Sequence, residues 1–178
     1  MKEMENEIIN PALMLAISRM KENNNLITQN KMIGEALNAK FLVPGIMRFK
    51  PGTEREQKRT SENTMLNFSM LKNPEGVMYF VAFTDMGEFE KWKVKAGQTM
   101  AILVMTFDEI ADLIRKSGDQ SNGFVLNPAT SKVTFQKSIV LSVIENRDRA
   151  IAEGKIKKVT PEEAFNPDSE SDKGEGEA

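Results

Sequence analysis

The fold of this chain is decided by the stretch EGVMYFVAFTD, residues 75–85. Residues 77–83 at its centre are all apolar, which is typical of a strand buried on both faces of a sheet. The preceding segment 64–71 alternates, because Leu66, Phe68 and Met70 would share one face, and this pattern indicates a half-exposed antiparallel strand. The turn sequence NPEG lies between the two segments. The sequence therefore predicts a hairpin at the centre of a sheet.

The residues that follow this strand predict helices with marked beginnings. DMGE at 85–88 has the pattern of a capping box with Asp in the first place, and predicts a short helix through Trp92 that Gly97 breaks. Residues 99–105 predict a second buried strand. TFDE at 106–109 is a full capping box, which predicts that another helix begins there.

The N-terminal part predicts a helical hairpin and a strand. NP at 10–11 is a good helix start, and Thr28 is expected to cap a second helix. FLV at 41–43 predicts a strand that ends at Pro44 or lies at a sheet edge, because proline cannot donate to a ladder. Residues 48–63 are polar and charged, and predict a long mobile loop.

The C-terminal part predicts two short strands, a long helix and a tail. The strands are expected at 123–126 and 133–135, and the helix at 137–152. All elements together predict an α+β fold: a single-layer mixed sheet with an antiparallel hairpin and helices packed on it, an α/β sandwich. We expect one domain over 1–155, a short helical extension over 156–166 and a disordered acidic tail over 167–178.

The 178-residue chain contains no histidine and no cysteine. This composition excludes Ser-His-Asp and Cys-His catalytic sets, thiolate nucleophiles, disulfides, and zinc sites built on these side chains. The remaining acids, amines and hydroxyls fall in no catalytic motif, and the glycines form no phosphate-binding loop. We therefore expect a protein that is not an enzyme and that uses no cofactor or metal.

The net charge of −2 is unevenly distributed. Residues 162–178 contain seven acids and one base, a charge of −6, which leaves +4 for residues 1–161. The acidic start lacks the features of a secretory signal, and no run approaches the roughly 20 apolar residues of a membrane span. We expect a cytoplasmic protein that does not bind membranes.

A set of segments carries a family resemblance. In chain order they are the helical pair after NP at 10–11, FLVP at 41–44, EGVMYFVAFTD at 75–85, EFEKW at 88–92, TFDEI at 106–110 and GFVLNP at 123–128. Their order and spacing resemble the N-terminal domain of the enhanced serine sensitivity (SseB-type) family, over roughly residues 9–145. The resemblance implies a small cytoplasmic bacterial protein whose molecular activity is not established, and it supplies no catalytic residues. Longer members have a second, C-terminal domain, for which residues 146–178 are too short.

Polar residues at two predicted strand ends form a candidate ligand site. Thr84 and Asp85 lie where the central strand opens into a helix, and Asn127 and Pro128 follow a later strand. Ligands bind at such strand ends, and the exposed amides of a helix start favour anions. The alternative, which we favour, is that Asp85 only caps its helix and that Asn127 and Pro128 only form a turn.

Trp92 is the only tryptophan, and three lysines at 91, 93 and 95 surround it. It could anchor a protein partner, because tryptophan is enriched at interface hot spots. The favoured alternative is that its ring packs on the sheet.

Two charged segments suggest further sites. The loop 48–62 holds five bases and three acids and could touch nucleic acid, but a solvated loop is favoured. Asp108, Glu109 and Asp112 could hold a metal, but acids in a first helical turn are favoured by the helix dipole alone.

The leading hypothesis is a non-enzymatic interaction or adaptor domain. It would present the sheet edge and the helix that bears Trp92 to a protein partner that the sequence does not identify. The alternative is a small-ligand, metabolite-binding module with its site near Thr84, Asp85 and Asn127. Nucleic acid is not an expected partner.

Overall fold

The computed structural model describes residues 7–50, 64–92 and 100–156. The elements of these residues follow one another in the order α1 (Pro11–Glu22), α2 (Leu26–Leu37), β1 (Lys40–Phe49), β2 (Thr64–Phe68), β3 (Met70–Lys72), β4 (Met78–Ala82), α3 (Met86–Lys91), β5 (Met100–Thr106), α4 (Phe107–Lys116), a short 3₁₀ turn (Gly118–Gln120), β6 (Gly123–Leu126), β7 (Val133–Gln136) and α5 (Lys137–Ala152).

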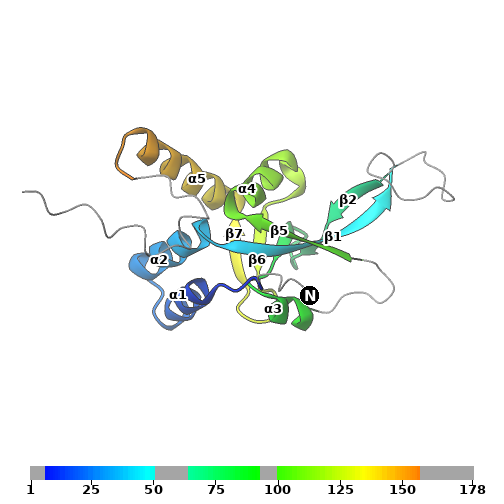
Figure 1. The fold of residues 1–178 in the computed structure, drawn as a ribbon, viewed down its shortest axis with the longest axis horizontal. Helices are drawn as coiled ribbons and strands as arrows, with labels where there is room; N and C mark the ends of the chain where they lie inside the picture. Colours follow the sequence, from blue (N-terminus) through cyan, green and yellow to red (C-terminus); the bar gives the residue numbers. More distant parts are fainter. Residues whose placement is uncertain (1–6, 51–63, 93–99, 157–178) are drawn as a thin grey trace, which may run out of the picture.

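The strands form two hydrogen-bonded sheets that are joined at one point. The first sheet has the order β2-β1-β5 and the second the order β3-β4-β6-β7. β4 and β6 are parallel, whereas the other pairs are antiparallel. Leu42 and Phe83 join the sheets through two backbone hydrogen bonds of 2.9 Å. This arrangement confirms the predicted α+β class (Figure 1), with two sheets in place of the single mixed sheet that was predicted.

The main core lies between the sheets and four of the helices. α1, α2, α4 and α5 contribute apolar side chains to one buried cluster, together with alternate residues of β1, β4, β6 and β7. In β4 these are Phe80 and Ala82, whereas Val81 of β4 and Phe83, which directly follows that strand, belong to a second cluster that includes Phe89 and Trp92. β4 is therefore buried on both faces, as its uninterrupted apolar sequence predicts, with α3 on the second face.

The strand that contains Pro44 is longer than predicted and lies in the middle of its sheet. β1 pairs with β5 over residues 40–46 and with β2 over residues 45–49. The carbonyl of Pro44 accepts from the backbone N–H of Ser69, on the β2 side, at 2.9 Å. The two polar backbone groups of a strand residue point to the same side, so the missing N–H of Pro44 faces the end of β2. The expectation that proline would end the strand or place it at an edge was wrong, because this proline costs the β1–β5 ladder no bond.

The alternating segment 64–71 does not form one strand with a hairpin partner. It divides at Ser69 into β2, which pairs with β1, and β3, which pairs with β4. The predicted hairpin therefore consists only of β3 and β4, while β2 belongs to the other sheet. Alternation is a local property, so it reports the exposure of each face but not the strand with which the segment pairs.

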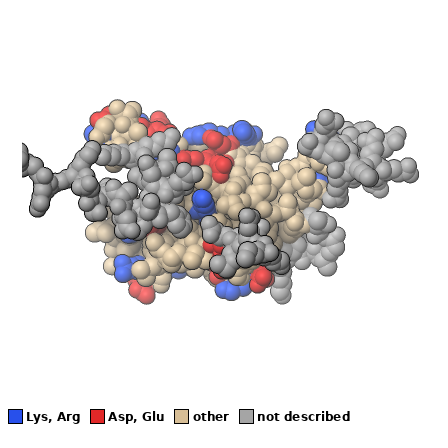
Figure 2. Space-filling view, in the orientation of Figure 1, with Lys and Arg blue, Asp and Glu red and all other residues tan. Residues whose placement is uncertain are grey.

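β5 was predicted to be a buried strand, but it lies at the edge of its sheet and is only partly buried. Its only partner among the described strands is β1, and Val104 is 51% exposed. Figure 2 shows the middle of this face, over β1 and β5, as mostly uncharged, whereas acidic and basic side chains alternate over α4 and α5. The β5 edge of this sheet is therefore apolar.

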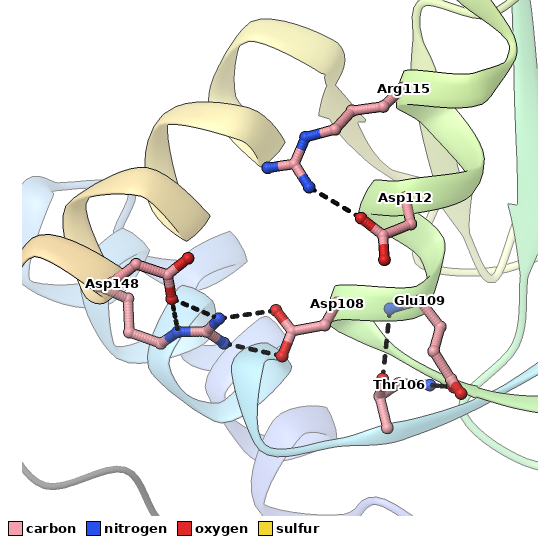
Figure 3. Close-up of polar contacts among 7 residues, drawn as sticks. Thr106, Asp108, Glu109, Asp112, Arg115 and Asp148 are labelled. Atoms are coloured by element: carbon pink, nitrogen blue, oxygen red, sulfur yellow. Dashed lines mark hydrogen bonds and ion pairs between the residues drawn. The ribbon is translucent and has the colours of Figure 1, made fainter. Parts of the chain in front are cut away.

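The helix starts follow local side-chain chemistry, with one correction. Both hydrogen bonds of the predicted capping box between Thr106 and Glu109 are present at the start of α4 (Figure 3). α2, in contrast, is capped by Asn25 and not, as was predicted, by Thr28. Thr28 is the third helical residue, and its side chain makes the second bond of the capping box. The predicted long helix is confirmed as α5, Lys137–Ala152.

The two C-terminal helices are joined by an ion pair. Arg147 of α5 makes two hydrogen bonds to Asp108 of α4, at 2.8 and 3.0 Å, and also contacts Asp148 (Figure 3). Asp112 pairs with Arg115 on its own helix. Asp108, Glu109 and Asp112 thus have separate structural partners. In the described part of the chain, no cluster of acidic side chains could hold a metal ion.

Several predictions concern residues outside the described ranges. Residues 51–63 of the predicted loop, and the predicted extension and tail beyond Ile156, are among them. Arg48 and Phe49, which were assigned to the loop, belong to β1 instead. Within the described residues, no helix is both long enough and apolar enough to cross a membrane.

Candidate functional site

The parallel pairing of β4 and β6 brings their carboxyl ends together, and the polar residues after each strand meet there. The Asn127 side-chain oxygen accepts from the backbone N–H of Thr84 at 3.0 Å, and its amide nitrogen donates to the Thr84 hydroxyl at 2.9 Å. Both residues have 0% exposure. Thr84 and Asn127 therefore form an internal link between two strand ends.

Asp85 extends this network into α3. One carboxylate oxygen accepts from the Thr84 hydroxyl and the other from the backbone N–H of Glu88, each at 2.9 Å. Asp85 is therefore the N-cap of α3, the role that the sequence favoured. In a full capping box the Glu88 side chain would also accept from the backbone N–H of Asp85. Here the Glu88 side chain accepts from Thr130 and Lys91 instead.

The buried Glu88 carboxylate ties the helix to the loop between β6 and β7. It accepts from the Thr130 hydroxyl in that loop and from the Lys91 ammonium at 2.8 Å. This hydrogen bond, together with the negative charge of Glu88, raises the pKa of Lys91 above 10.5. Glu88 is 6% exposed, so the two cross-links satisfy a carboxylate that would otherwise be costly to bury.

Two asparagines complete the network. The Asn10 side-chain nitrogen donates to the carbonyls of Lys40 and Thr84, at 2.8 and 2.7 Å. The Asn127 carbonyl accepts from the N–H groups of Thr130 and Lys132, at 3.1 and 2.9 Å. Asn127 has a φ of 49°, in the left-handed region that asparagine tolerates better than most residues. The network therefore fixes the shape of the loop 127–132 as well as the start of α3.

A cavity of about 520 Å³ lies beside this network. We call it the Trp92 cavity. It is lined by Leu71, Lys72, Asn73, Pro74, Tyr79, Lys91, Trp92, Val125, Pro128, Ala129, Lys132 and Thr134. The side chains of Tyr79, Val125 and Thr134 come from the same face of the sheet as Val81, opposite to the main core. The volume falls within the range of roughly 300–1,000 Å³ that ligand pockets occupy.

The walls of the Trp92 cavity are held by the hydrogen-bond network. Lys91 and Trp92 lie at the C-terminal end of the helix that Asp85 caps, while Pro128, Ala129 and Lys132 belong to the loop that Asn127 shapes. The Glu88–Thr130 bond joins these two walls. The tryptophan ring lies 5.6 Å from that of Phe83 and 6.4 Å from that of Phe89, so its position is set by aromatic packing.

The candidate residues from the sequence divide between two places. Thr84, Asp85 and Asn127 lie in the network, whereas Trp92 and Pro128 line the cavity. Apart from Lys91, which is next to Trp92 in the chain, the other lining residues have no signal in the sequence; among them Tyr79 and the lysines at 72 and 132 carry polar chemistry. Tyr79 and Val81 are alternate residues of β4, so they lie on the same face of the sheet. The sequence does not show which other residues share this face, because that depends on the pairing of β4 with β3 and β6.

Comparison with known proteins identifies a family. The family model described as the SseB protein N-terminal domain matches residues 13–140. Neither the curated proteins nor the solved structures give a match. The matched range begins in α1 and ends in α5, so it includes every residue of the network except Asn10, and all the described lining residues of the Trp92 cavity.

Proposed function

This chain belongs to the SseB N-terminal domain family, and from that premise we propose that it is a non-enzymatic, cytoplasmic interaction domain that binds a protein partner at the Trp92 cavity. The observation that carries the proposal is the juxtaposition of Trp92, Tyr79 and Pro128 in one concave surface. Aromatic side chains at such positions supply much of the binding energy of protein interfaces.

The exposure of the lining residues supports a role in docking. Trp92 and Pro128 are half-buried, and Ala129 and Lys132 beside them are exposed. A half-buried tryptophan that is fixed by neighbouring aromatic rings loses little conformational freedom when a partner covers it. The absence of histidine and cysteine supports a role in binding over one in catalysis.

The small-ligand alternative is less well supported at the position where the sequence suggested it. The Thr84 and Asn127 side chains are fully buried and bond to each other, and one Asp85 oxygen is used by each of its two partners. A ligand there would have to displace these bonds, which makes binding unfavourable. The network is better understood as support for the neighbouring cavity.

Affinity purification from the native cell tests the proposal. We expect the tagged full-length chain to recover one stoichiometric partner, and Trp92→Ala to lose it. Because that change also removes packing on Phe83 and Phe89, a second variant, Ala129→Tyr, adds uncharged bulk at the exposed rim of the cavity. Circular dichroism and thermal melting establish that both variants are folded.

Leu15→Tyr provides the matched control, because Leu15 is 52% exposed in α1 and does not line the Trp92 cavity. We expect this variant to retain the partner. Retention of the partner by folded Trp92→Ala and Ala129→Tyr would show that the cavity is not the binding surface.

A further inference from the structure

We propose that the Trp92 cavity receives an extended acidic segment of the partner protein, an inference that rests on the proposed function. The segment would place an apolar or proline residue against Trp92 and Tyr79, and its carboxylates against Lys72 and Lys132. The basis of this inference is the distribution of charge around the cavity.

The rim of the cavity carries an excess of positive charge. Its lining includes Lys72 of β3, Lys91 of α3 and Lys132 of the β6–β7 loop, and none of its described lining residues is acidic. All three lysines are exposed. Lys91 is paired with Glu88, whereas Lys72 and Lys132 have no acidic partner within the described ranges. Two lysine charges are therefore available for a ligand.

The arrangement of these charges favours a protein segment over a small anion. A pocket for a small anion brings several donors together at one point, often with a buried charged group. Here the lysines come from three separate elements, and they surround a floor of apolar and aromatic residues. An extended peptide can contact the floor and the separated charges at once, and complementary charge also speeds its association.

A nucleic acid fits this surface less well. Nucleic-acid-binding domains usually carry a strongly basic face and a high isoelectric point. The isoelectric point of this chain is about 5.4. The described cavity lining offers three lysines and no arginine, which is a small electrostatic footprint for binding to a phosphate backbone.

Trp92 provides a direct reporter, since it is the only tryptophan in the chain. The full-length protein is titrated with the synthetic peptide EEDPLEDEE, and with QQNPLQNQQ as its neutral analogue, while tryptophan fluorescence is recorded. We expect a saturable change with the acidic peptide and binding at least tenfold weaker with the neutral one. Binding of the acidic peptide should weaken further when sodium chloride is raised from about 50 to about 300 mM, because salt screens exposed charges.

Charge variants locate the interaction. We expect the K72E/K132E double variant to weaken binding of the acidic peptide at least tenfold, and K72Q/K132Q to give a smaller loss. R19E/K116E is the matched control, because Arg19 and Lys116 are exposed and lie outside the cavity. This control should bind the peptide as the unmodified protein does.

The outcomes separate this inference from the proposed function. Three results would overturn the proposal that the cavity binds an acidic segment. They are the absence of a saturable signal with the acidic peptide, equal binding of the neutral peptide, and full binding of the acidic peptide by K72E/K132E. Loss of the cellular partner in Trp92→Ala would still support the interaction domain in each of these cases. A twelve-nucleotide oligothymidine and tripolyphosphate are tested as competitors of the peptide. If either binds saturably and displaces the peptide, the proposal that the cavity binds a protein segment is overturned.

The acidic tail of the chain itself is the remaining occupant to distinguish. Residues 162–178 carry a charge of −6. In a full-length variant, the acids of this segment are changed to the corresponding amides. Unchanged affinity for the acidic peptide supports a separate partner, whereas a tenfold tighter affinity identifies the tail as the occupant and overturns a separate partner.

Discussion

Asn127 and Thr84 are 43 positions apart in the chain and are joined by two hydrogen bonds. These bonds connect the carboxyl end of β6 to that of β4. Every polar atom in this pair is removed from solvent. The pair therefore stabilises the parallel strand junction from which the walls of the Trp92 cavity extend.

Replacement of Asn127 by alanine should lower the free energy of unfolding by about 1–3 kcal/mol, because it leaves the buried Thr84 N–H without its acceptor and the Thr84 hydroxyl with only its bond to Asp85. Chemical denaturation measures the loss. Asn127→Gly separates the causes: it relieves the cost of a φ of 49° but restores no hydrogen bond, so we expect it to be nearly as destabilised. Full recovery of stability in Asn127→Gly would mean that backbone conformation, not the hydrogen bonds, dominates. Asn30→Ala, an exposed site in α2, is the control and should change stability little.

Gly123→Ala should destabilise the fold by more than about 4 kcal/mol. A Cβ atom at this position would lie 1.9 Å from the backbone oxygen of Phe135, and the φ of 133° is one that alanine rarely adopts. Gly34→Ala, inside α2, adds a carbon that meets nothing within 4 Å beyond the adjacent backbone of its own helix, and should instead stabilise by about 0.5–1 kcal/mol. Thermal melting of the two variants gives the comparison, and a stable Gly123→Ala protein would contradict the close approach of β6 and β7.

Thr130→Val should separate the two walls of the Trp92 cavity without changing a residue that lines it. The substitution removes the hydroxyl that Glu88 accepts from, and leaves a buried carboxylate oxygen unpaired at a cost of about 1–3 kcal/mol. We expect weaker binding of the acidic peptide by this variant, measured by Trp92 fluorescence. Thr134→Val, which does line the cavity but makes no bond to Glu88, tests whether loss of any nearby hydroxyl has the same effect.

The Lys91 ammonium should titrate above 10.5, and Glu88→Gln should return its pKa toward that value, because the hydrogen bond and charge of Glu88 are the main causes of the shift. A pKa that is raised in the folded state stabilises the fold below the unfolded value. This contribution is fully present below about pH 10.5 and is lost as the pH rises through the folded pKa. NMR titration of isotopically labelled lysine measures both values, and an identical Lys91 titration in Glu88→Gln would exclude the pairing.

A double-mutant cycle on Asp108 and Arg147 should give a coupling free energy of about 0.5–1 kcal/mol between α4 and α5, because the pair is bidentate but partly exposed. The coupling should decrease in high salt. Asp112 and Arg115, an exposed pair three positions apart on one helix, provide the comparison and should couple by no more than about 0.5 kcal/mol. Equal coupling in both cycles would show that the two-helix geometry adds nothing.

The elements that were predicted well are those whose signals are local. α5 begins and ends where the sequence indicates, and the capping box of α4 forms both of its bonds. The buried strand at 78–82 follows from its apolar run. The presence of helices beside strands, and hence the α+β class, needed no knowledge of which strands pair.

The predictions that failed depended on neighbours distant in the chain. Pro44 is tolerated in a central strand only because its missing N–H faces the end of β2. The alternating segment divides at Ser69 because its two halves find different partners in different sheets. β5 is apolar and yet lies at an edge, which no property of its own seven residues reports.

The amino-acid sequence by itself determined the helices, the buried strand, the family resemblance and the absence of imidazole and thiol chemistry, because each of these depends on residue identity or short-range spacing. Only the tertiary structure decided that Thr84 and Asn127 bond to each other and that Trp92, Tyr79 and three lysines surround one cavity. The physical reason is that strand pairing brings together residues tens of positions apart, and the contacts that select one pairing over another are formed by the whole core.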